Sequence, residues 1–166
     1  MESRYISIPR SSALERNRYD AAAEDRVRVL LVENDSDDAQ LIREAFEGGS
    51  TETTVDVVAD GEEAFEFLQQ RLDESSPVPD LVLLNLDLPG MGGFELLEAI
   101  REDGELVHLP VLVLTNSDAT EDVHESYDRA ANAYLTKPSD PAAFETIATA
   151  IERFWFERAS LPPIHP

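Results

Sequence analysis

Leu81-Val82-Leu83-Leu84 leads directly into Asn85, and this stretch decides the fold. A short, unbroken apolar run is typical of a strand that is covered on both faces. The next segment, Leu86-Asp87-Leu88-Pro89-Gly90-Met91, contains the Pro-Gly pair of a turn, so the strand ends at Asn85. We therefore expect the Asn85 side chain to stand at the end of a buried strand.

Strands of the same kind recur along the chain and alternate with segments of helical spacing. The predicted strands lie at residues 27–32, 54–58, 80–85, 110–114 and 133–136. Five strand–helix units in succession predict an α/β fold with a doubly wound parallel sheet, since right-handed crossovers place helices on both faces. In such a sheet the functional residues gather at the carboxyl ends of the strands.

Polar residues ahead of the apolar stripes predict where the helices begin. Ser36 or Asp37 is expected to cap the first helix, and Asp60 the second, with Glu63 at its third position. Asp118 is expected to open the fourth helix. The last helix has Asp140 as its predicted cap, followed by Pro141 at the first helical position.

The last two helices carry apolar stripes that we expect to face the core. These stripes consist of Ala119, Val123, Tyr127 and Ala130 in the fourth helix and of Phe144, Ile147, Ala148, Ile151, Phe154 and Trp155 in the fifth. Because successive helix residues are about 100° apart, Phe156 falls on the acidic face. An exposed aromatic ring is typical of a partner surface. The alternative is that the Leu161-Pro162-Pro163 segment covers Phe156.

The composition bounds the class of protein. Of the 166 residues 42% are apolar, which is enough for a core, and the absence of cysteine excludes disulfides and thiolate metal sites. We see no membrane span or signal peptide and expect a cytoplasmic protein. Residues 1–26 are expected to form a disordered tail, or one that docks on the body or a partner, residues 27–158 the domain, and residues 159–166 a proline-rich tail.

The charge is strongly acidic: 35 acidic residues against 13 basic ones give a net charge of −22, and Lys137 is the single lysine. The acids are spread over the whole body, which favours a solvated, halophile-like surface suited to high salt, where screening shortens charge repulsion. A docking surface for a basic partner is the alternative interpretation. Nucleic-acid binding is not expected, because no basic face is available to neutralise phosphates.

The carboxyl ends of the predicted strands carry a chemically coherent set of side chains, namely Glu33-Asn34-Asp35, Asn85, Thr115-Asn116 and Lys137. Oxygen ligands after the first strand suit a hard divalent cation. A carboxylate after the third strand would be a nucleophile, a hydroxyl after the fourth could bond a phosphoryl oxygen, and a lysine after the fifth could pair with its charge. This arrangement indicates a site for phosphoryl transfer, although the third strand delivers an amide.

At this point the chain resembles the receiver domain of two-component response regulators over about residues 27–158. The motifs that carry the resemblance are Leu30-Leu31-Val32-Glu33-Asn34-Asp35, Asp80-Leu81-Val82-Leu83-Leu84-Asn85 with Leu88-Pro89-Gly90-Met91, Val113-Leu114-Thr115 and Tyr134-Leu135-Thr136-Lys137-Pro138. The ending Glu152-Arg153-Phe154-Trp155, followed by Leu161-Pro162-Pro163, is similar to stand-alone receivers that pair with phytochrome-type histidine kinases.

The resemblance implies a flavodoxin-like sheet with strand order 2-1-3-4-5 and five helices. It also implies a role in a phosphorelay pathway, with a sensor histidine kinase or another signalling protein as partner and no enzyme activity of its own. The family's functional positions fall on Glu33 and Asn34 (acidic pair), Asn85 (phosphoacceptor), Asp87 (metal-binding backbone carbonyl), Thr115 (switch hydroxyl), Tyr134 (switch aromatic) and Lys137 (phosphate-pairing lysine).

Two of these positions depart from the family pattern. An asparagine carbonyl carries no full charge and cannot form an acyl phosphate as an aspartate does, so Asn85 removes the nucleophile. Asn34 removes a carboxylate, which leaves Glu33 as the only anion of the set, so we expect no cofactor and weak magnesium binding at most. The sequence therefore indicates an atypical pseudo-receiver that acts by binding another protein.

Alternatives remain open at this stage. Asp35 and Asp87 lie beyond the two amides and could still reach the mouth of the site, and Asp87 could serve as a substitute phosphoacceptor in a functional receiver. A flavodoxin-like binder of small molecules is disfavoured, because Glu33-Asn34-Asp35 would repel a phosphate.

The switch positions also have purely structural interpretations. Thr115 could cap the fourth helix, Tyr134 could be a core aromatic of the edge strand, and Lys137 could pair only with Glu33. For assembly, the resemblance implies a homodimer through the fourth helix, fifth strand and fifth helix. The residues expected to contribute contacts are Phe154, Trp155 and Phe156.

Overall fold

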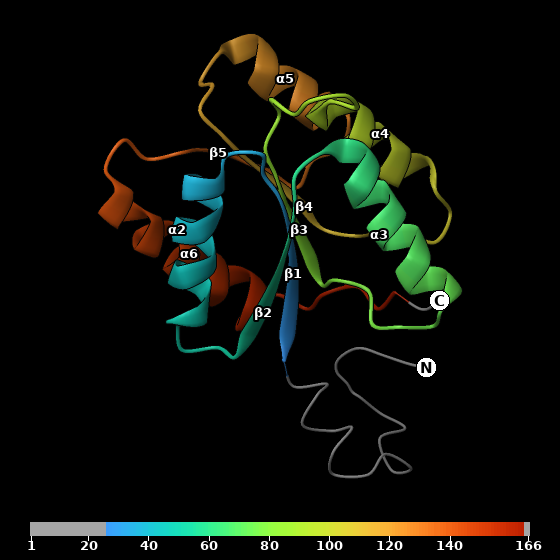
Figure 1. Ribbon diagram of the computed structural model, residues 1–166, viewed down its shortest axis with the longest axis horizontal. Helices are drawn as coiled ribbons and strands as arrows, with labels where there is room; N and C mark the ends of the chain where they lie inside the picture. Colours follow the sequence, from blue (N-terminus) through green and yellow to red (C-terminus); the bar gives the residue numbers. More distant parts are fainter. Residues whose placement is uncertain (1–25, 165–166) are drawn as a thin grey trace, which may run out of the picture.

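In the computed structural model, which describes residues 26–164, five parallel strands form one sheet in the order β2-β1-β3-β4-β5, with helices on both faces (Figure 1). The strands are β1 (Val27–Val32), β2 (Thr53–Val58), β3 (Leu81–Leu84), β4 (Val111–Thr115) and β5 (Ala133–Thr136). The helices are α2 (Ser36–Glu47), α3 (Gly61–Asp73), α4 (Gly93–Glu102), α5 (Thr120–Asp128) and α6 (Phe144–Ile151). A 3-10 turn, η2 (Pro141–Ala143), precedes α6, and a π-helical turn, η3 (Glu152–Phe156), follows it. The predicted α/β architecture and strand order are confirmed, whereas the expected disorder of the N-terminal tail concerns residues almost all of which lie outside the described range.

The unbroken apolar strands arise because both faces of the sheet are covered. In β3, Leu81 and Leu83 face the layer of α2 and α6, whereas Val82 and Leu84 face the layer of α3 and α4. All four side chains are fully buried. A parallel sheet with helices on both faces therefore explains the continuous apolar run in the sequence.

The register of the sheet brings the functional positions to one edge. Val32 of β1 lies opposite both Val58 of β2 and Leu84 of β3, so the residues that follow β1 and β3 are neighbours. The Asn85 N–H donates to the Val32 carbonyl at 3.0 Å. Across the other half of the sheet, Thr115 pairs with Thr136.

The cap of α3 agrees with the prediction, and those of α2 and α5 do not. Asp140 caps η2, the 3-10 turn that leads into the last helix, whereas α6 itself begins at Phe144 without a side-chain cap. Asp60 accepts from the Glu63 N–H at 2.8 Å, and Asp140 accepts from the Ala142 N–H at 3.0 Å. The cap of α2 is Asp35, not Ser36 or Asp37, because its side chain is the one that reaches the free N–H groups of the first turn.

The fourth helix of the prediction, α5, differs from expectation at its start and on its apolar face. It begins at Thr120 after Ala119, with no side-chain cap, so the proposal that Asp118 opens it is wrong. Within α5 only Ser126 is buried, and the Tyr127 side chain is 51% exposed. The apolar stripe of this helix therefore does not face the core.

Phe154 and Phe156 face the opposite way from the prediction, whereas Trp155 packs against the core as expected. Phe154 is 58% exposed, whereas Phe156 packs beside Phe46, with ring centroids 6.2 Å apart. The cause is η3: the Glu157 N–H donates to the Glu152 carbonyl, a bond that spans five residues instead of four. This wider turn changes which face later residues occupy, and the predicted outward position of Phe156 assumed regular α-helix.

Across residues 26–164, every helix is too short or too polar to cross a membrane.

Candidate functional site

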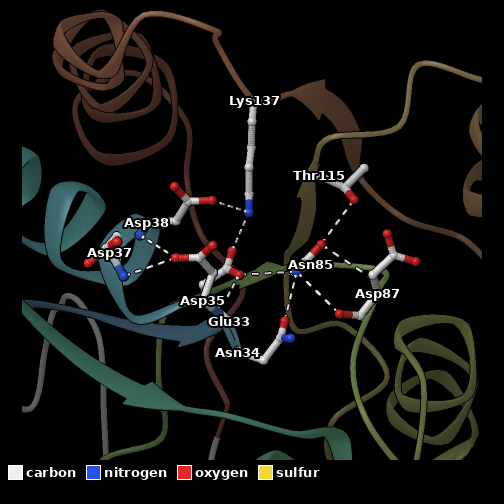
Figure 2. Close-up of polar contacts among 9 residues, drawn as sticks. All are labelled: Glu33, Asn34, Asp35, Asp37, Asp38, Asn85, Asp87, Thr115 and Lys137. Carbon is white, nitrogen blue, oxygen red and sulfur yellow. Dashed lines mark hydrogen bonds and ion pairs between the residues drawn. The ribbon is translucent and has the colours of Figure 1, made fainter.

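The site at the carboxyl edge of the sheet begins with Glu33, which directly follows β1. Glu33 is only 3% exposed, and its two carboxylate oxygens have different partners (Figure 2). Oε1 forms an ion pair with Lys137 Nζ at 2.8 Å, and Oε2 accepts from Asn85 Nδ2 and from the Asp35 N–H, each at 3.1 Å. Glu33 therefore connects the end of β1 with the ends of β3 and β5.

Lys137 is buried between two carboxylates. It follows β5, and its N–H donates to the Thr115 carbonyl at 2.7 Å, which fixes the backbone. Its ammonium lies 2.8 Å from Glu33 Oε1 and 2.8 Å from Asp38 Oδ2. Burial alone would lower the pKa of the Lys137 ammonium, but the hydrogen bonds and charges of Asp38 and Glu33 outweigh it and raise the pKa. The predicted pairing with Glu33 is confirmed, but Glu33 is not the sole partner, because Asp38 also pairs with Lys137.

Asp38, the second partner of Lys137, was missed by sequence reasoning. It lies in the first turn of α2, where acidic side chains are common because they interact favourably with the positive end of the helix dipole. A signal was nevertheless present in the charges, because a buried lysine at this edge needs compensation and Asp38 is one turn beyond the polar residues that follow β1.

Asn85 lies at the centre of the site and is 6% exposed. Its nitrogen, Nδ2, donates to Glu33 Oε2 and Asn34 Oδ1 at 3.1 Å each and more weakly to the Asp87 carbonyl at 3.4 Å. Its oxygen, Oδ1, accepts from Thr115 Oγ1 at 3.0 Å. Both ends of the amide are therefore engaged by neighbouring residues (Figure 2).

Thr115 continues the network towards α5. Its hydroxyl is fully buried and donates to Asn85, so the interpretation of Thr115 as the cap of the fourth helix is wrong. Two residues later, the Ser117 carbonyl accepts from the Tyr134 hydroxyl at 2.6 Å. Burial, together with the charges of nearby carboxylates such as Asp122, raises the pKa of Tyr134. The half-buried Tyr134 ring packs against the core, as the structural interpretation expected, while its hydroxyl holds the β4–α5 loop.

The two displaced carboxylates, Asp35 and Asp87, take no part in the centre of the site. Asp35 Oδ1 accepts from the N–H groups of Asp37 and Asp38 at 2.9 and 3.0 Å, so the side chain caps α2. Asp87 contributes its backbone carbonyl to Asn85, and its exposed carboxylate points away from Lys137 (Figure 2).

The aromatic residues proposed as a dimer contact lie away from this site. Phe156 packs beside Phe46 near the C-terminal end of α2, whereas Asp35 and Asp38 are at its N-terminal end. Any role of Phe154 and Trp155, whose rings are edge-on at 5.3 Å, is therefore separate from the polar site.

Comparison with known proteins gives a consistent result. The sequence profile of the response regulator receiver domain matches residues 29–149. Response regulator Rcp1 of Synechocystis sp. is 38% identical over 135 residues, which cover 81% of this chain and 92% of Rcp1.

Solved structures agree in fold. The crystal structure of the Mn2+-bound form of Rcp1 has a TM-score of 0.75 and 37% identity, over 82% of this chain and 99% of that one. The phosphorylated cyanobacterial phytochrome response regulator RcpA has a TM-score of 0.77 and 37% identity, again over 82% and 99%. RPA3017, a response regulator in red light signaling of R. palustris, has a TM-score of 0.74 and 30% identity over 82% and 98%.

Proposed function

This chain belongs to the response regulator receiver domain family, and from that premise we propose that it is a pseudo-receiver in two-component signalling. In this proposal it acts by binding another signalling protein and is not phosphorylated at Asn85. The relatives Rcp1 and RcpA are matched over nearly their whole length, so a receiver domain makes up almost all of those proteins. We propose that this chain likewise signals through the surface of its receiver domain.

The observation that carries the proposal is the amide at the end of β3. Phosphoryl transfer to a receiver requires a nucleophilic oxygen with a free lone pair and negative charge. Asn85 Oδ1 has no full charge and already accepts from Thr115 at 3.0 Å, while Nδ2 is turned towards Glu33 at 3.1 Å. The side chain at this position therefore supports binding without phosphorylation.

The partner that we propose is a sensor histidine kinase or another signalling protein. Two of the similar structures are of a phytochrome response regulator and of a response regulator in red light signaling, which favours a photoreceptor kinase as the class of partner. The strongly negative body, at a net charge of −22 for the chain, does not favour nucleic acid.

We also propose a homodimer, with Phe154 as its aromatic contact. Phe154 is 58% exposed beside Trp155, whereas Phe156, the residue expected from helical periodicity, is packed on Phe46. Burying the Phe154 ring against a two-fold mate would contribute roughly 1.5–3 kcal/mol per side.

The experiment for the proposed function is incubation with a small phosphodonor and Mg2+, followed by intact-mass measurement. The wild type should keep its mass, whereas the double variant Asn34→Asp with Asn85→Asp should gain one phosphoryl group, because Thr115 and Lys137 are already at the site. Asp87→Asn is the matched control for the substitute acceptor. A stoichiometric gain by the wild type that disappears in Asp87→Asn would refute the proposal.

A further inference from the structure

The three atoms that accept from Asn85 Nδ2 form a set of oxygen ligands. They are a carboxylate oxygen of Glu33 and an amide oxygen of Asn34, both at 3.1 Å, and the backbone carbonyl of Asp87 at 3.4 Å. Carboxylate, amide and backbone carbonyl oxygens are the ligands that hard divalent cations take in proteins. Here the three oxygens converge on a nitrogen of the protein itself (Figure 2).

The orientation of the Asn85 amide follows from its neighbours. A carboxylate and a backbone carbonyl are acceptors only, so the group that faces Glu33 and the Asp87 carbonyl must be the NH2. On the other side, the Asp87 N–H can only donate, and it points at Oδ1 at 3.4 Å. Turning the amide over would place oxygen against oxygen at the first two contacts and N–H against N–H at the third. The hydrogen bonds therefore define a single arrangement.

We infer that the Asn85 amide nitrogen is a built-in substitute for a divalent cation in this site. The inference rests on the proposed function, since it explains how the site stays assembled without a phosphoryl group. The two amide hydrogens carry the partial positive charge that the oxygens of Glu33 and Asn34 require. Mg2+ needs its oxygen ligands at about 2.0–2.1 Å in near-octahedral geometry, whereas these oxygens lie 3.1 to 3.4 Å from the amide nitrogen and already accept its hydrogen bonds.

The nearby lysine also lowers the need for a cation at Glu33. Lys137 supplies one positive charge to Glu33 and Asp38, so Glu33 is partly compensated before any ion arrives. Within residues 26–164, no three His, Cys, Asp or Glu side chains are grouped as ligands for a metal. Because Asn85 Nδ2 already bonds the oxygens of Glu33, Asn34 and Asp87, the residues present do not fit the divalent ion that the family fold implies.

The substitution has a consequence for the adjoining loop. The amide group is planar, so the three acceptors that hold its nitrogen also fix the position of Oδ1. Asn85 Oδ1 accepts from the Thr115 hydroxyl. Thr115 begins the loop whose Ser117 carbonyl is held by Tyr134. The contacts between the acidic end of β1 and the β4–α5 loop are thus complete without an added ion.

The test is titration with Mn2+ alone, at constant high ionic strength and without a phosphodonor, followed by calorimetry. Asn85→Ala removes the amide without changing the charge, so Mn2+ should bind to it roughly fivefold or more tightly than to the wild type. If Mn2+ binding were limited only by the missing negative charge at position 85, Asn85→Ala and the wild type would have equal affinities for Mn2+. The affinity of Asn85→Asp should rise further, because this variant adds a carboxylate among the oxygens.

Asn116→Asp is the matched control. The sequence grouped Asn116 with the site, but its side chain is exposed, so the substitution adds the same charge outside the buried network of Asn85 and Thr115. Its Mn2+ affinity should stay at the wild-type level. Two results would overturn the inference: a wild-type Mn2+ affinity within about threefold of that of Asn85→Asp, or a folded Asn85→Ala that binds Mn2+ no more tightly than the wild type. If Asn85→Ala does not fold, the comparison of Asn85→Asp with Asn116→Asp decides: equal affinities refute the inference. Phosphorylation of Asp87 would refute the proposed function but leave these affinities unchanged, so the two failures can be told apart.

Discussion

At the scale of single residues, the site is a chain of buried polar groups in which each group satisfies its neighbour. Lys137 and Glu33 have side chains that are 2% and 1% exposed, and Asn85 joins them to Thr115. A buried charge without a partner costs several kcal/mol. The stability of this edge of the sheet therefore depends on keeping all of these partners together.

Replacement of Lys137 by methionine should destabilise the protein by about 3–5 kcal/mol, because it leaves Glu33 and Asp38 without their cation. Denaturant unfolding measures the loss. The matched control is Glu125→Gln, which breaks the half-exposed pair with Arg129 on α5 and should cost about 1 kcal/mol at most. Equal losses in the two variants would show that the buried pairs do not hold this edge.

The sequence predicted which residues meet at the site better than it predicted how they bond. The carboxyl ends of the strands identified Glu33, Asn85, Thr115 and Lys137, since strand ends follow from apolar runs. Asp38 was not found, because its contact with Lys137 spans 99 residues and depends on how α2 packs. The charges indicate that a lysine at this edge needs a carboxylate partner, but local pattern does not identify which acidic residue it meets.

At the scale of elements, predictions from periodicity held for the strands and failed at η3 and on the apolar face of α5. The strands follow the apolar runs closely, and Asp60 caps α3 as expected, while Asp140 caps the 3-10 turn ahead of α6. The spacing of apolar residues over 152–156 does not indicate the π-helical turn η3. Because of this turn Phe154 faces solvent and Phe156 packs on the core, the reverse of what a regular α-helix predicts. The exposed stripe of α5 has a different cause, since a helix at the edge of the sheet has less core to cover.

The two aromatic residues of η3 should differ in what their removal does. Phe156→Ala should lower the free energy of unfolding by about 2 kcal/mol, because the ring is partly buried on Phe46. Phe154→Ala should change it by less than about 0.5 kcal/mol, because the ring is exposed. Thermal or denaturant unfolding of the two variants gives the comparison.

Light scattering of the same variants tests the proposed assembly. In high salt, Phe154→Ala should weaken the homodimer, while folded Phe156→Ala should retain it. A wild type that is monomeric at high salt and high protein concentration would remove the dimer from the proposal.

At the scale of the whole molecule, two terms oppose each other in the stability of the fold. The apolar layers on both faces of the sheet stabilise it, and the like charges on the surface destabilise it. The two fully buried strands, β3 and β4, supply cohesion, and a net charge of −22 opposes compaction through self-repulsion. The fold class could be predicted because the core pattern is strong. The effect of the charge on stability depends on the solvent and leaves no local pattern in the sequence.

The melting temperature should therefore rise steeply as salt increases from about 0.1 M to 1 M, where the Debye length falls from about 10 Å to about 3 Å. A neutral osmolyte at matched osmolality is the control, since it strengthens burial without screening charge. A melting temperature that stays flat with salt would instead favour a dedicated acidic docking face over a surface suited to high salt.

The central claim is that the Asn85 amide holds the site together without an ion or a phosphoryl group. Its most direct test is solvent exchange of the Asn85 side-chain amide hydrogens by NMR, with the resonances identified by their loss in Asn85→Asp and Asn116 as the exposed internal reference. We predict that Asn85 exchanges at least about tenfold more slowly than Asn116 and that adding Mg2+ with a small phosphodonor changes neither its exchange nor its chemical shift. Exchange as fast as that of Asn116, or a shift of the Asn85 resonances on addition of Mg2+, would contradict the claim.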